Sequence, residues 1–131
     1  MVEISSHDYV EKAFGGKSPG CIKLQRINME QHKIDFESIP WTSPMKGVRQ
    51  KIFKAGNRQL RLVEYSICMS EHWCEKGHIG YVLEGKMEIQ FDDEACTYSS
   101  GDGIFIPEGK ENRHMAKILS DTVTAVFIED L

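Results

Sequence analysis

Three side chains that can bind a transition metal lie in one short segment of the chain: His72, Cys74 and His78. Imidazole nitrogens and a thiolate favour Zn²⁺, Fe²⁺, Ni²⁺ or copper, whereas Mg²⁺ and Ca²⁺ prefer oxygen ligands. In extended backbone, alternate side chains point to the same face, so His72 and Cys74 would share a face, and His78 has the same parity. The spacing therefore predicts a site for a divalent transition metal such as Zn, Fe or Ni.

A second pair of donors, Asn112 and His114, follows Pro107 and Gly109 at the start of another strand-like segment. His114 is the stronger candidate for a fourth ligand, because an amide is a poor ligand for soft metals. With four protein ligands the site would be closed and structural, whereas three would leave a position for water, dioxygen or substrate. The sequence leaves both possibilities open, with His72, Cys74, His78 and His114 as the predicted metal ligands.

The elements that must position these donors are short and mostly extended. One helix is predicted over residues 6–14, with Ser6 as its N-cap and Gly15-Gly16 at its end. Segment 39–44 holds two prolines and is predicted to be irregular. The predicted strands are 21–24, 33–36, 48–53, 60–67, 79–83, 86–91, 95–98, 103–106, 115–119 and 123–128. Short strands separated by turn residues, with no helices between them, favour an all-β antiparallel barrel or sandwich.

The donors and their surroundings resemble the first motif of the cupin superfamily, whose members are small jelly-roll barrels that usually hold one metal. That motif runs Gly, then His-x-His, three or four residues, Glu, six residues, Gly. Here His72 and Cys74 occupy the two His positions, His78 occupies the Glu position, and Gly85 is the closing glycine. Two of these three ligand positions therefore carry a different residue that can still bind a metal.

The second cupin motif runs Gly, five residues, Pro-x-Gly, two residues, His. Gly101, Pro107 and Gly109 match it, Asn112 stands at the His position, and His114 follows two residues later on the same predicted strand face. The resemblance covers residues 48–128. It implies a double-stranded β-helix, or jelly-roll, barrel with the short N-terminal helix outside it, and a transition metal inside.

The composition is that of an ordinary soluble protein, with 131 residues, 40% hydrophobic and 27% charged. We expect one domain over 1–131, with a helix and arm at 1–20 and the barrel at 21–131. No apolar run approaches the roughly 20 residues of a membrane helix, and the start of the chain lacks a signal-peptide pattern, so a cytoplasmic location is expected. A net charge of −4 offers no basic surface for nucleic acid.

The four cysteines form no CxxC pair and no spacing typical of a disulfide framework. Cys21, Cys68 and Cys96 lie in or beside apolar segments, so they are expected to be buried free thiols. Cys74 differs from them because histidines flank it.

Two classes of function remain open. The first is an enzyme that acts on a small polar metabolite, such as a sugar acid, keto acid or amino-acid derivative. It would be a metal-dependent isomerase or lyase, or a dioxygenase that activates O₂ at Fe²⁺. The second is a non-catalytic metal- or ligand-binding sensor that resembles the cupin domains of anti-sigma factors. No catalytic residue is assigned. A homodimer is expected, because edge strands such as 48–53 and the N-terminal arm need a partner.

Overall fold

Nine strands and two short 3-10 turns make up the regular structure of residues 32–131, which are the residues that the computed structural model describes. The predicted helix 6–14 and the predicted strand 21–24 lie outside these residues. The strands are β1 Thr42–Met45, β2 Val48–Ala55, β3 Arg58–Ser66, β4 His78–Glu84, β5 Lys86–Gln90, β6 Ala95–Ser99, β7 Gly103–Ile106, β8 Met115–Ile118 and β9 Thr122–Asp130; the turns are η1 Phe36–Ser38 and η2 Lys110–Asn112.

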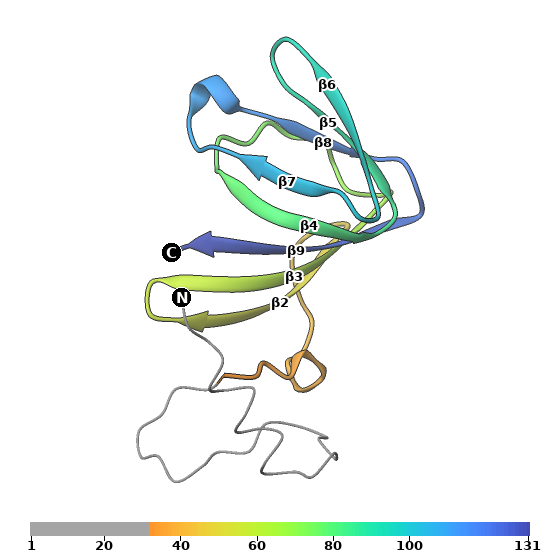
Figure 1. Cartoon of the computed structure of the whole chain (residues 1–131). Helices are drawn as coiled ribbons and strands as arrows, with labels where there is room; N and C mark the ends of the chain where they lie inside the picture. The colour runs from red at the N-terminus through yellow and green to blue at the C-terminus, as the bar shows by residue number, and fades with distance from the viewer. Residues whose placement is uncertain (1–31) are drawn as a thin grey trace, which may run out of the picture. The chain divides into compact units, whose positions relative to one another are not determined.

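The strands form two antiparallel sheets. The larger has the order β1-β2-β3-β9-β4-β7 and the smaller the order β6-β5-β8. The last strand, β9, lies between β3 and β4, so the C-terminal strand is a central strand of the larger sheet (Figure 1). This arrangement confirms the predicted all-β jelly-roll barrel.

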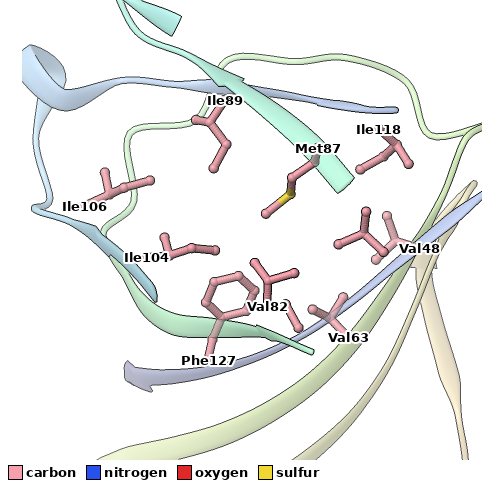
Figure 2. Close-up of a cluster of buried hydrophobic side chains, with 11 residues drawn as sticks. Val48, Val63, Val82, Met87, Ile89, Ile104, Ile106, Ile118 and Phe127 are labelled. Atoms are coloured by element: carbon pink, nitrogen blue, oxygen red, sulfur yellow. The ribbon is translucent and has the colours of Figure 1, made fainter. Parts of the chain in front are cut away.

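The core lies between the two sheets. Met87 and Ile89 of β5 and Ile118 of β8 point toward residues of the larger sheet such as Val82 and Phe127 (Figure 2). Val63, Val82, Val123 and Ala125 have no exposed surface. Each fully buried side chain of the size of valine or isoleucine stabilises the fold by about 1.5–3 kcal/mol. Apolar residues therefore occupy the strand positions that face inward, as the period-two pattern predicts.

Gly85 joins the two sheets between β4 and β5. Its φ is +92°, a conformation that residues with a Cβ rarely adopt. A Cβ built there would lie 2.2 Å from the Thr122 carbonyl oxygen, which is far too close for a real contact. The closing glycine of the first motif therefore has a steric role that is independent of any metal.

Two strand predictions near the start of the described residues are wrong. Segment 33–36 is not a strand: the Phe36 carbonyl instead accepts hydrogen bonds from the Ile39 amide at 3.1 Å and from Lys51 Nζ at 2.7 Å, so the chain turns there. Conversely, Thr42–Met45 forms strand β1 despite Pro44. Because β1 is an edge strand whose register shifts between Thr42 and Met45, the missing proline N–H costs little.

The strands belong to one compact unit, Phe36–Leu131. Among the described residues, no helix has the length and apolar character needed to cross a membrane.

Candidate metal centre

Two loops bring potential metal ligands together. One loop, residues 67–77, connects β3 to β4 and carries Cys74; His78 is the first residue of β4. The other loop, residues 107–114, connects β7 to β8 and ends with His114. Potential ligand atoms of Cys74, His78 and His114 all lie within 4.8 Å of one another. We call these three residues the Cys-His-His cluster.

The two loops are joined by backbone hydrogen bonds. The Cys74 amide donates to the His114 carbonyl at 2.8 Å, and the His114 amide donates to the Cys74 carbonyl at 2.9 Å. Nearby, the Gly109 amide donates to the Glu75 carbonyl at 3.0 Å. The two bonds between Cys74 and His114 form an isolated antiparallel bridge that holds the backbones of these potential ligands side by side.

The loop before His78 also packs closely on the loop after β7. A Cβ at Gly77 would lie 2.9 Å from the Ile106 carbonyl oxygen and 3.0 Å from the Glu108 amide nitrogen. Only a residue without a side chain allows this approach, so Gly77 helps to set where β4 and His78 begin. The Lys76 amide donates a hydrogen bond to Cys74 Sγ at 3.5 Å.

His114 is the buried member of the cluster, with 5% of its surface exposed. Its Nδ1 lies 3.0 Å from the Asn112 carbonyl, which can only accept, so Nδ1 carries the hydrogen and Nε2 has a free lone pair. Within residues 32–131, this buried Nε2 has no hydrogen-bond partner. Burial lowers the pKa of His114; the Asn112 carbonyl opposes this shift, whereas His78 and His72 add to it. The neutral ring is the form that can bind a metal.

His78 packs against His114, with ring centroids 5.1 Å apart in a T-shaped arrangement. Its Nδ1 lies 3.3 Å from Glu129 Oε2. This is an ion-pair distance, and Nδ1 has no hydrogen-bond partner among the described residues. The carboxylate therefore lies close enough to attract a hydrogen carried by Nδ1.

Glu129 belongs to a charged network that the sequence analysis missed. Arg61 donates to both Glu129 oxygens, at 3.0 Å from Nε and 2.7 Å from Nη2, and Gln59 Nε2 donates at 2.7 Å. Burial favours the neutral acid, but His78 and Arg61 outweigh it and hold the pKa of Glu129 well below its usual range. The sequence did contain a sign of this network. By the alternation of side chains along a strand, Arg61 lies on the same inward face as Val63, and Glu129 on the same inward face as Phe127.

A pocket of about 840 Å³ opens over the cluster and this network. Its polar lining includes Gln50, Gln59, Arg61 and Glu129, and its apolar lining includes Ile52 and Met69. Tyr65 also lines it, and burial raises the pKa of this phenol while Arg61 opposes the shift. A cavity of this size that combines apolar walls with a few polar groups suits a small molecule.

The other predicted donors are placed differently. His72 lines the same pocket but lies in the loop before Cys74, where it is exposed and outside the cluster; its Nδ1 lies 3.3 Å from the Ser70 carbonyl. Asn112 supplies its backbone carbonyl to His114. The predicted parity of His72 and Cys74 required a strand, but the structure has a loop there, so their side chains need not share a face.

The predictions for the remaining cysteines are only partly correct. Cys68 is exposed and Cys96 is half-buried, so neither is a fully buried thiol; Cys21 lies outside the described residues. Cys68 lies beyond the end of β3, where the apolar strand pattern no longer implies burial.

The donors of the Cys-His-His cluster fit a transition metal. Two imidazoles and a thiolate suit zinc, iron or nickel, and a metal ion would satisfy the buried imidazole nitrogen that has no partner among the described residues. Bonds of about 2.0–2.3 Å to zinc place tetrahedral ligands about 3.5 Å apart, so ligand atoms within 4.8 Å of one another would move closer together to bind one ion. Three protein ligands would leave one coordination position open to the pocket.

Comparisons with known proteins agree with this fold. The family model for the cupin domain matches residues 69–129, which include the whole cluster. The structure resembles that of a cupin-2 domain containing protein from Shewanella frigidimarina at 23% identity, over 63% of this chain and 79% of that chain, with a TM-score of 0.53. No curated protein sequence matches the chain.

Two further solved structures show the same fold. KdgF from Halomonas sp. is 22% identical over 72% of this chain and 91% of its own, with a TM-score of 0.59. The polyketide cyclase RemF from Streptomyces resistomycificus is 20% identical over 77% of this chain and 80% of its own, with a TM-score of 0.61. The family match over residues 69–129, the motif positions and the fold of the barrel together support the cupin superfamily.

Proposed function

We propose that this cupin binds a divalent transition metal through Cys74, His78 and His114 and uses the open coordination position to bind or transform a small polar metabolite. The observation that carries the proposal is the buried Nε2 of His114, which has no partner within residues 32–131 and belongs to a cluster with two further soft donors. A buried polar atom without a partner is costly unless a ligand satisfies it.

The residues of the pocket have separable roles in this proposal. Cys74, His78 and His114 would hold the metal, which would supply Lewis-acid chemistry or, as iron, dioxygen chemistry. Gln50 and Gln59 offer amide groups that can bind hydroxyl or carboxylate groups of a sugar acid, keto acid or amino-acid derivative. The apolar walls at Ile52 and Met69 would exclude water from that ligand.

A sensing module without chemistry is the second candidate, and His72 is the observation that favours it. His72 lines the same pocket as the cluster. If its loop moved so that the imidazole became a fourth ligand, the metal would be closed to substrate, as in structural zinc sites.

The test is metal content after purification without added metal, for the wild type and a Cys74→Ala/His78→Ala variant, together with a thermal-shift titration of Zn²⁺. We expect bound metal and Zn²⁺-dependent stabilisation only in the wild type, about 2.7 kcal/mol when free Zn²⁺ is one hundred times the Kd. Equal metal content in both proteins would overturn the proposal. A water ligand that exchanges on bound Co²⁺ would indicate the open site, and the lack of such a water would indicate the closed site.

The protein is also proposed to form a cytoplasmic homodimer. β1 pairs with the Val48–Gln50 part of β2, so that part of the predicted edge is already covered. The outer face of the larger sheet is a better candidate, because Phe105, Ile79 and Ile128 lie opposite one another on β7, β4 and β9 and are 74%, 48% and 47% exposed. A second copy would bury this patch.

A further inference from the structure

We propose that Glu129 is a positioning residue for the metal centre: its carboxylate holds the Nδ1 hydrogen of His78 and leaves Nε2 of that ring as the ligand. The inference rests on the proposed metal site, and it assigns a role to a residue outside the Cys-His-His cluster.

The strand register places Glu129 beside His78. Gln59 of β3 is paired with Glu129 of β9, and the next pair along β9 and β4 is Ile128 with Ile79. Continuing this register by one residue sets Glu129 opposite His78, and His78 is paired in turn with Ile106 of β7. One row across the inner face of the sheet is therefore formed by Gln59, Glu129, His78 and Ile106. In this row, Glu129 Oε2 is 3.3 Å from His78 Nδ1.

Glu129 is held in place from the side opposite to His78. Arg61 donates to both carboxylate oxygens and Gln59 donates to Oε1, so three hydrogen bonds fix its orientation. Only 14% of the Glu129 side chain and 13% of the Arg61 side chain are exposed. A bidentate guanidinium keeps the carboxylate ionised and unable to rotate freely.

The Glu129 carboxylate lies beside His78 Nδ1 and is not one of the candidate ligands. No oxygen of Glu129 belongs to the group of ligand atoms that lie within 4.8 Å of one another. An anion beside Nδ1 stabilises the tautomer with hydrogen on that nitrogen and leaves the lone pair of Nε2 for a metal. The Asn112 carbonyl does the same for His114, so both rings would use Nε2.

The contact between Glu129 Oε2 and His78 Nδ1 is 3.3 Å long. Binding of a cation at Nε2 makes the Nδ1 hydrogen more acidic and so strengthens its bond to the carboxylate.

The experiment measures the Kd of the metal-free protein for Zn²⁺ and Co²⁺ in the wild type, in Glu129→Gln and in Asp130→Asn. Asp130 is the matched control, because it is the next residue on β9, has the same charge, pairs with Arg58 and is 77% exposed. We expect a 10- to 100-fold weaker Kd for Glu129→Gln and less than about a twofold change for Asp130→Asn. Nitrogen-15 NMR should show the Nδ1–H tautomer of His78 in the wild type and a mixture of tautomers in Glu129→Gln.

A double variant that keeps the buried charges balanced separates the loss of metal binding from misfolding. Glu129→Gln leaves Arg61 without its anion, whereas Arg61→Gln/Glu129→Gln removes both charges, and circular dichroism of each metal-free protein checks the fold. Weaker binding by the folded double variant would support the inference. Equal Kd values for it and the wild type would overturn the inference while the metal site stands. Failure of the wild type to bind either metal would instead overturn the proposed function.

Discussion

Cys74 and His114 exchange both of their backbone hydrogen bonds, at 2.8 Å and 2.9 Å, although they lie in two different loops of the barrel. The bridge fixes the backbone of one soft donor against that of another before any metal arrives. Pre-organised ligands lose less conformational entropy on binding, so the bridge should contribute to metal affinity.

Cys74 should differ from the other described cysteines in its effect on the metal. We expect Cys74→Ser to abolish the near-ultraviolet charge-transfer band that a thiolate gives with Co²⁺, because serine supplies no thiolate. Cys96→Ser should leave the band unchanged, since Cys96 lies in β6 and outside the cluster. Absorption spectra of the Co²⁺-loaded proteins check this. A band that survives in Cys74→Ser would show that another thiolate binds the metal.

Gly77→Ala should weaken metal binding without a change of any ligand. The added methyl would meet the Ile106 carbonyl at 2.9 Å, so the loop between Cys74 and His78 would have to move. A displacement of this kind should weaken the Kd for Zn²⁺ about tenfold, as do changes next to the ligands of other metal sites. Gly103→Ala is the control, because its methyl would have only an ordinary contact at 3.9 Å. Isothermal titration calorimetry measures both values, and equal affinities would contradict the steric role of Gly77.

The Glu129 network should stabilise the metal-free fold in a pH-dependent way. The pKa of Glu129 is lower in the folded chain than the ordinary value of 4.5, so the unfolded chain takes up the proton first as the pH falls. The stabilisation is therefore complete well above pH 4.5 and is lost progressively below it. Glu129→Gln should cost about 3 kcal/mol at neutral pH and much less near pH 3, because it breaks a largely buried pair.

Urea unfolding of the metal-free proteins at the two pH values measures this difference. Asp130→Asn removes a pair that is mostly exposed, so it should cost less than about 1 kcal/mol at either pH. If Glu129→Gln lowered the free energy of unfolding equally at both pH values, altered packing rather than the lost charge would explain its effect.

The exposed patch of Phe105, Ile79 and Ile128 should hold two copies together. We expect light scattering at micromolar concentration to give the mass of a dimer for the wild type and of a monomer for Phe105→Glu, because burying a carboxylate in an apolar interface is costly. Ile67→Glu is the control, since Ile67 is also exposed, at 59%, but follows β3 and lies outside the patch. A wild-type monomer that does not associate on concentration would contradict the dimer.

Much of the fold could be predicted from local pattern alone. Eight predicted strands from 48 onward correspond to β2 through β9, because alternation of apolar and polar residues depends only on neighbours along the chain. The pattern failed where contacts from other segments decided the backbone. At Phe36 a lysine side chain of β2 binds the carbonyl, and at Pro44 an edge position tolerates the missing N–H.

The types of the candidate ligands were determined by the sequence itself, since donor chemistry and motif spacing pointed to His72, Cys74, His78 and His114. Only the tertiary structure decided that His72 lies outside the Cys-His-His cluster and that Glu129, which is paired with Arg61, lies beside His78. The reason is physical: the register between β4 and β9 depends on packing and hydrogen bonds between distant segments. The local pattern shows which face each side chain occupies, but not which side chain it meets there.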